Sequence, residues 1–209
     1  MADAICFAGG SLYGLEAATG VSAEILKERG NARWEQIACV QSAIIYDFDA
    51  RPTTVYPDKA LGALARTNAK SGGCPIGQVG AGRLATVGKA LESTCYRPEA
   101  GGQGAAFRDI NTVKVLVVTI VNALGVIIDK SGKVIRGLRD SQTGHRMHPR
   151  DIIDVTPQNG APSAAGGNTT VTALIINRKI DRLSLTQLAR QVHASKGTRH
   201  SSVPYRPRR

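Results

Sequence analysis

The sequence predicts an α+β domain in which sheets and helices pack in layers. Its 209 residues can bury a substantial core, and a content of 42% hydrophobic and 21% charged residues is typical of a globular protein. Segments with strand and helix patterns follow one another without the regular alternation of a parallel βαβ sheet. The Gly80-Ala81-Gly82 run lacks the G-x-G-x-x-G spacing, so we expect no dinucleotide site.

The first half of the chain predicts two strands and two helices. Ala4 to Ala8 is a short apolar strand that leads into a glycine turn, after which apolar residues recur at helical spacing. Ala38 to Phe48 has the composition of a buried strand, and Pro57 is expected in the first turn of a second helix. Glycine is dense between Ser71 and Gly88, which predicts that another segment passes close by.

The second half predicts further strands and one helix. Val113 to Thr119 and Val126 to Ile128 are expected to pair, and residues 129–132 should form a hairpin turn. Small residues from Pro157 to Gly167 predict a loop, and Thr169 to Asn177 has the β-branched composition of a strand. Ser184 to Ser195 predicts a helix. We therefore expect one domain over residues 1–195 and a basic, disordered tail over residues 196–209.

Charge restricts the expected partners. The formal net charge is +11, and eight of these positive charges lie from Arg178 onward, so the body is nearly neutral. The tail has one aromatic residue, Tyr205, and we expect no nucleic-acid binding beyond non-specific contacts. The longest apolar run, Leu116 to Ile128, is shorter than the ~20 residues of a membrane-spanning helix.

Cysteine and histidine usage indicates a cytoplasmic protein without a metal or other cofactor. The four cysteines are scattered without a CxxC pair, and the N-terminus has no signal-peptide pattern, so buried, reduced thiols are expected. His145 and His148 lie three residues apart in a basic segment with no further ligand nearby. They are interpreted as surface residues, not as metal ligands.

One short segment suggests covalent chemistry. Gly167-Asn168-Thr169-Thr170 joins the loop of small residues to an apolar strand, with a hydroxyl residue at the boundary. A threonine released at a new N-terminus carries its own base, an α-amino group with a pKa of about 7.7–8.0. The same four residues also suit a turn followed by the start of a strand, and composition alone favours that simpler interpretation.

The ordered set of blocks along the chain resembles the DmpA-type family of self-processing aminopeptidases, and within it the nylon oligomer hydrolases. These proteins are N-terminal nucleophile hydrolases. The blocks are collinear and spread over the chain from about Ala4 to Ser195. They comprise residues 8–10, 13–17, 20–21, 45–48, 55–62, 80–82, 88–89, 102–108, 122, 125–129, 142–144, 167–170 and 191–193.

The resemblance implies an αββα sandwich and cleavage between Asn168 and Thr169, which would give a larger chain of residues 1–168 and a smaller chain from residue 169. Thr169 would be the nucleophile. Asn122 and Tyr46 would polarise the substrate carbonyl or stabilise the oxyanion, and Lys89 would place a positive charge beside the nucleophile. The implied substrates are 6-aminohexanoate (nylon) oligomers or short peptides.

The chain departs from the family pattern at both ends. Family members have strands before the position of Ala4 and an acidic strand region after the helix that contains His193. The sandwich is therefore expected to be incomplete at both ends, with exposed sheet edges that favour a homo-oligomer. Two alternatives stay open: an acyltransferase with the same nucleophile, and a catalytically impaired, truncated homologue whose basic tail binds polyanions.

Overall fold

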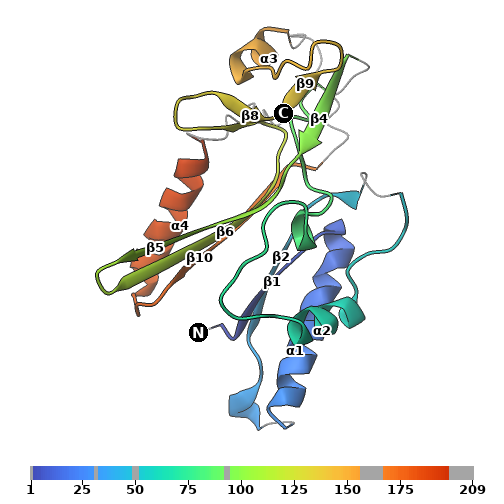
Figure 1. Cartoon of the computed structure of the whole chain (residues 1–209). Coiled ribbons are helices and arrows are strands. Elements are labelled where there is room, and N and C mark those ends of the chain that lie inside the picture. Colours follow the sequence, from blue (N-terminus) through green and yellow to red (C-terminus); the bar gives the residue numbers. More distant parts are fainter. Residues whose placement is uncertain (1, 31–32, 49–51, 92–94, 156–166, 198–209) are drawn as a thin grey trace, which may run out of the picture.

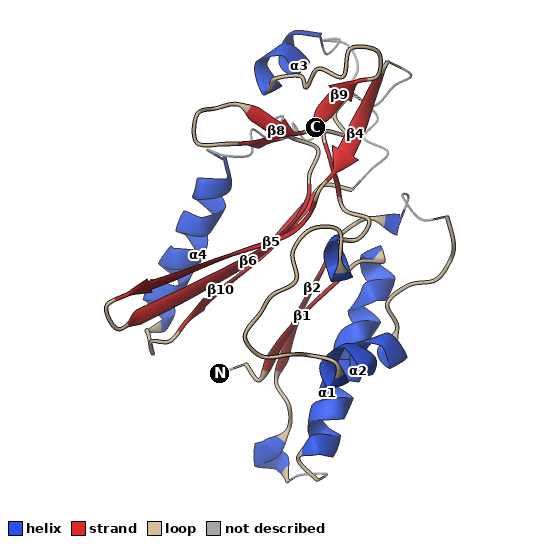
Figure 2. Cartoon of the chain, viewed as in Figure 1, coloured by secondary structure: helices blue, strands red, loops and turns tan. Residues whose placement is uncertain are grey.

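The computed structural model describes residues 2–30, 33–48, 52–91, 95–155 and 167–197. Helices and strands are both present in these residues, and the strands form four small sheets (Figure 2). The predicted α+β class is confirmed. The expected loop residues 157–166 and the expected tail residues 198–209 lie outside the described part.

The N-terminal part is a strand–helix–strand unit followed by a helix. Its elements are β1 (Ala4–Ala8), α1 (Glu16–Glu28), β2 (Val40–Ile44) and α2 (Lys59–Thr67). The two strands are parallel, with Ala4 opposite Val40. The Asp58 carboxylate accepts a hydrogen bond from the Leu61 N–H at 2.8 Å and caps α2. Pro57 therefore lies before the cap, and not in the first turn as expected.

A second sheet contains the strands β5 (Gly102–Ile110), β6 (Val113–Asn122) and β10 (Thr169–Ile176). Its order is β10-β6-β5, and both pairings are antiparallel. The expected pairing of Val113–Thr119 with Val126–Ile128 is wrong, because β5 and β10 occupy both edges of β6. Asn111, with a φ of 58°, closes the β5–β6 hairpin in the left-handed region that asparagine tolerates.

The layers follow the order helix, sheet, sheet, helix (Figure 1). In that view α1 and α2 lie on one side of β1 and β2, and α4 (Arg182–Gly197) lies on the far side of the β5–β6–β10 sheet. A core cluster of Ile45, Ala85 and Ile120, joined by Phe7 and Val171, fills the space between the two sheets. The α4 layer covers its sheet thinly, and one sign of this is that Leu183 of α4 is 70% exposed. The helix also continues to Gly197, two residues into the expected tail.

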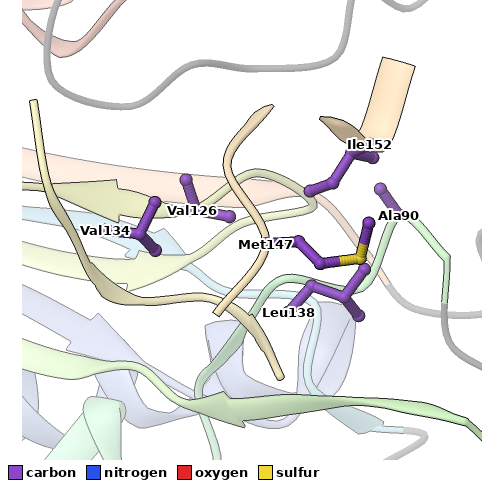
Figure 3. Close-up of a cluster of buried hydrophobic side chains, with 6 residues drawn as sticks. All are labelled: Ala90, Val126, Val134, Leu138, Met147 and Ile152. Atoms are coloured by element: carbon purple, nitrogen blue, oxygen red, sulfur yellow. The ribbon is translucent and has the colours of Figure 1, made fainter. Parts of the chain in front are cut away.

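A smaller lobe carries the remaining elements and has a core of its own. They are β3 (Thr86–Val87), β4 (Tyr96–Ala100), β7 (Ile127–Ile128), β8 (Val134–Arg136), β9 (Leu138–Asp140) and α3 (Pro149–Val155). The β7–β8 hairpin confirms the predicted turn at residues 129–132. Figure 3 shows the apolar cluster at the centre of this lobe, formed by Ala90, Val126, Val134, Leu138, Met147 and Ile152.

The glycine-dense segment makes the close approach that its composition predicts. Gly88 has a φ of +81°, and a Cβ atom built on it would lie 2.1 Å from the carbonyl carbon of Gly137. The Gly88 N–H also donates to the Gly125 carbonyl at 2.7 Å. Only a residue without a side chain satisfies both the backbone angle and the spacing, and this contact fixes the chain just before Lys89.

The cysteines are not buried as expected. Cys39 and Cys95 are exposed, while Cys6 and Cys74 are half-buried. They lie in or beside short edge strands and loops, where few side chains are available to cover them. Within the described residues, no helix has the length and apolar character of a membrane span. The same residues contain no group of three or more His, Cys, Asp or Glu side chains suited to a metal ion.

Candidate active site

Thr169 and Asn122 face each other at one end of the β5–β6–β10 sheet. Thr169 is the first residue of β10, Asn122 is the last residue of β6, and the two are partners in the antiparallel register. The β-branched run of β6 and that of β10 make this pairing favourable, and Thr119 and Thr172 add a cross-strand hydrogen bond of 2.9 Å. The strand pairing alone therefore places the amide beside the hydroxyl.

The Asn122 side chain is the centre of the site and is 1% exposed. Its Nδ2 donates to Thr169 Oγ1 at 3.2 Å, to the Tyr46 carbonyl at 2.6 Å and to the Gly167 carbonyl at 3.3 Å. Its Oδ1 accepts from the Thr86 N–H at 3.1 Å and from Lys89 Nζ at 3.0 Å. Since donors surround the oxygen and acceptors surround the nitrogen, the amide has a single favourable orientation.

Lys89 reaches the same point from the other lobe and is 7% exposed. Its Nζ donates to the Gly167 carbonyl at 2.6 Å as well as to Asn122 Oδ1. Ala90, the next residue, is buried in the cluster of Figure 3, so the backbone that carries Lys89 is held by that core. Lys89 Nζ is the donor in both hydrogen bonds, and a charged donor polarises the carbonyl that it contacts more strongly than a neutral one.

Tyr46 enters the site through its main chain. The Tyr46 N–H donates to Thr169 Oγ1 at 2.8 Å, and its carbonyl accepts from Asn122. The preceding Ile45 is completely buried between the sheets and holds this backbone in place. The Tyr46 side chain is 43% exposed and lines an adjoining pocket. Among the described residues, no hydrogen bond joins the Tyr46 phenol to Thr169.

Gly167 and Asn168, which precede Thr169, make contacts in the site that the sequence did not predict. A Cβ atom on Gly167 would lie 2.0 Å from the Tyr46 Cβ, so the chain passes against Tyr46 only because residue 167 is glycine. The exposed Asn168 accepts a hydrogen bond from the Leu124 N–H at its Oδ1, at 3.2 Å. The one signal in the sequence for these contacts was Gly167 itself, a glycine immediately before Asn168, after which cleavage is expected.

Two cavities lie near the first sheet. The smaller has a volume of about 260 Å³ and borders the site, with lining residues Ser11, Leu12, Tyr13, Tyr46, Phe48 and Gly167. We call it the aromatic pocket. The larger, about 600 Å³, lies between β1, α1, α2 and the Gly80–Leu84 segment, and its lining includes none of Thr169, Asn122, Lys89 and Tyr46. Of these two cavities, the aromatic pocket is therefore the one relevant to chemistry at Thr169.

The arrangement has the parts that acyl transfer needs. Thr169 Oγ1 accepts hydrogen bonds from two donors, which favours negative charge on this oxygen. Lys89 and Asn122 form a second pair of donors that already binds a carbonyl oxygen, that of Gly167. The fold and this site define an α+β protein in which a threonine hydroxyl is bound by a polar network centred on the buried Asn122.

Comparison with known proteins identifies the family. The chain is 46% identical over 195 residues to the 6-aminohexanoate-oligomer endohydrolases of Paenarthrobacter ureafaciens and of an Agromyces strain, and each match covers 92% of this chain and 54% of the relative. It is 28% identical over 203 residues to an uncharacterized aminopeptidase of Mycobacterium tuberculosis, which covers 91% of this chain and 55% of the relative. No protein-family model matches. The chain belongs to the family of these endohydrolases, and it spans about half the length of the curated relatives it matches.

Proposed function

We propose that the protein is an amide hydrolase of the N-terminal nucleophile type, in which Thr169 is both the residue released by self-cleavage and the nucleophile. The observation that supports this most directly is the convergence of the Tyr46 N–H and Asn122 Nδ2 on Thr169 Oγ1, at 2.8 and 3.2 Å. A threonine that merely begins a strand does not need a buried amide and a main-chain donor directed at its hydroxyl oxygen.

The self-cleavage step is an N-to-O acyl shift followed by hydrolysis. Thr169 Oγ1 bonds to the carbonyl carbon of Asn168, the C–N bond to Thr169 breaks, and the hydroxyl proton ends on the Thr169 nitrogen. Water then hydrolyses the ester, which leaves a carboxylate on Asn168 and a free hydroxyl and amino group on Thr169. The Leu124 N–H and Lys89 support this step, because they hold the Asn168 side chain and the carbonyl of the preceding Gly167.

Turnover repeats the same chemistry on a substrate amide. The free α-amino group of Thr169 accepts the hydroxyl proton and passes it to the leaving amine, while Oγ1 forms an ester with the acyl group. Lys89 Nζ and Asn122 Nδ2 are the donors best placed for the developing oxyanion, since they already hold one carbonyl oxygen. Water releases the acid and restores the hydroxyl.

The substrates that we propose are 6-aminohexanoate oligomers or short peptides. The names of the relatives in Paenarthrobacter and Agromyces support the oligoamide, and the mycobacterial relative supports the peptide. We also propose a homo-oligomer, because large apolar side chains of the β5–β6–β10 sheet are exposed, among them Phe107 and Ile110.

Intact mass spectrometry of the purified protein tests the proposal. We expect two species, residues 1–168 and residues 169–209, and one uncut species for Thr169→Ala. Thr169→Ser keeps a hydroxyl and is the matched control, which should still be cut. Release of amines from 6-aminohexanoate oligomers, followed by chromatography, should depend on the cut form. A wild-type chain that stays uncut and releases no amine would overturn the proposal.

A further inference from the structure

The residues just before Thr169 offer a template for substrate recognition. In the self-cleavage step the acyl group transferred to Oγ1 is the chain's own Gly167–Asn168 segment, so the path of that segment shows where an acyl chain fits beside the nucleophile. Counted back from the scissile carbonyl carbon of Asn168, the second chain atom is its own Cα. The fifth is the Cα of Gly167.

These two positions differ in the space they leave for a branch. At the second atom the Asn168 residue is exposed, and its side chain fits beside the Leu124 N–H. At the fifth atom a single added carbon would lie 2.0 Å from the Tyr46 Cβ, 2.8 Å from the Tyr46 carbonyl oxygen and 3.1 Å from the Tyr46 Cγ. Atoms of the main chain and Cβ cannot move aside cheaply, so a branch in the direction of an L side chain is excluded there.

The aromatic pocket continues this path, because Gly167 is one of its lining residues. The others are Ser11, Leu12, Tyr13, Tyr46 and Phe48, none of which carries a charge. The Tyr13 and Phe48 rings pack at a centroid distance of 5.5 Å and give the pocket an apolar wall. A pocket of this kind accommodates methylene groups and disfavours a charged terminus, because no lining side chain would compensate the lost hydration.

We infer that the place occupied by Gly167, together with the aromatic pocket, is the acyl subsite, and that it takes uncharged acyl chains unbranched at the fifth atom from the scissile carbonyl. This inference rests on the proposed function. It deepens that function by making Tyr46 and Phe48 specificity-determining residues. An N-acylated 6-aminohexanoyl chain meets the requirement, as does a peptide with glycine as the penultimate residue before the scissile bond.

Matched pairs of substrates test the subsite on the self-cleaved protein. One set is the p-nitroanilide of 6-acetamidohexanoic acid with a methyl group on C5, with a methyl group on C2, or with none. The 5-methyl compound should lose about tenfold or more in kcat/KM, the discrimination that one misplaced methyl group produces in a tight pocket. The 2-methyl compound should stay within about threefold of the parent, because a branch is accommodated at that atom. The peptide pair acetyl-Gly-Asn and acetyl-Ala-Asn p-nitroanilide should show the same preference for glycine.

A pocket variant adds an independent readout. Phe48→Ala removes part of the apolar wall and should raise KM for the 6-acetamidohexanoyl anilide by about three- to tenfold, while an acetyl anilide too short to reach the pocket is unaffected. Trp34→Ala is the matched control, since Trp34 is an exposed aromatic residue outside the pocket. Equal effects of both variants on both anilides would overturn the subsite.

Calorimetric binding of the free acids separates failure of the subsite from failure of the reaction. Tighter binding of the 2-methyl than of the 5-methyl acid supports the subsite, even if no anilide is turned over, and in that case only the proposed function fails. Equal binding of both acids, no binding of either, or equal turnover of the two methylated anilides overturns the subsite.

Discussion

The two ends of the β5–β6–β10 sheet differ in almost every physical respect. At one end, Asn122 and Thr169 form hydrogen bonds with Tyr46 just after β2, with Thr86 of β3 and with Gly167 before β10. At the other end, the β5–β6 hairpin extends away from the body (Figure 1), and Phe107 and Ile110 are 53% and 61% exposed. The same three strands therefore hold a closely constrained polar site at one end and an uncovered apolar surface at the other.

This difference shows what fixes a functional side chain in this protein. The strands themselves are similar along their length, and the constraint comes from the elements that meet their ends. Substitutions at the Asn122 end should change chemistry or stability strongly, while substitutions at the hairpin end should change association. The predictions below test that contrast, from the largest expected effect to the smallest.

The largest effect is expected for Asn122→Ala. It removes a donor to Thr169 Oγ1 and leaves the Thr86 N–H and Lys89 Nζ without an acceptor that they use now. We expect self-cleavage to slow by about 10²- to 10³-fold, as for the loss of comparable oxyanion donors. The measurement is the cut fraction over time by intact mass. The control is Asn177→Ala, an asparagine that binds Lys114 and Thr112 at the hairpin end, which should be cut at the wild-type rate.

A loss of stability comes next, from the core of the smaller lobe. Leu138 is completely buried in the cluster of Figure 3, and Leu138→Ala should lower the free energy of unfolding by about 2–5 kcal/mol. Because Ala90 belongs to this cluster, the change should also loosen Lys89 and slow self-cleavage. Urea unfolding gives the first quantity and intact mass the second. A destabilised variant that is cut at the normal rate would show that the cluster does not position Lys89.

An acid-dependent effect is expected from Glu99. Burial opposes ionisation of Glu99, but hydrogen bonds from Arg146 at 2.6 and 2.9 Å and from the Gly137 N–H outweigh it and hold its pKa below the ordinary value. A lowered pKa in the folded state stabilises the protein above the unfolded-state pKa of about 4.3, and this contribution disappears as the pH falls through the folded pKa.

Glu99→Gln therefore should cost about 1 kcal/mol or more at neutral pH, and less at an acidic pH below the folded pKa, where wild-type Glu99 is also protonated. Urea unfolding at the two pH values measures the difference. Asp109→Asn is a suitable control, since Asp109 is an exposed residue of the hairpin end with a 3.8 Å ion pair to Lys114. A cost for Glu99→Gln that does not depend on pH would contradict this account.

The smallest change in stability is expected at the hairpin end. Phe107→Ser should alter the free energy of unfolding by no more than about 0.5 kcal/mol, because the side chain is already more than half exposed. If this surface mediates self-association, the sedimentation coefficient should fall toward that of a monomer. An exposed polar change such as Arg108→Ser on the same strand should leave it unchanged, and identical behaviour of the two variants would exclude Phe107 from an interface.

Local patterns were sufficient for the elements whose signals are local. The strand before the first glycine turn, both N-terminal helices, the β7–β8 hairpin and β10 follow from spacing, composition and turn residues. β5 was not predicted, because Gly102 to Ala106 contains no β-branched residue. β4 was not predicted either, because it includes Pro98 and two charged residues. The predicted partner of β6 was wrong, because strand pairing depends on residues far apart in the sequence. Thr119 and Thr172, for example, are 53 positions apart.

The sequence by itself determined that Thr169 begins an apolar strand directly after a glycine and an asparagine, and its ordered blocks indicated Asn122, Lys89 and Tyr46 as candidates. Only the tertiary structure decided that these residues share hydrogen bonds, that Tyr46 contributes its main chain, and that Gly167 has no room for a side chain. The physical reason is that hydrogen-bond directions and packing distances arise between segments from 33 to 123 positions apart, which no local pattern records.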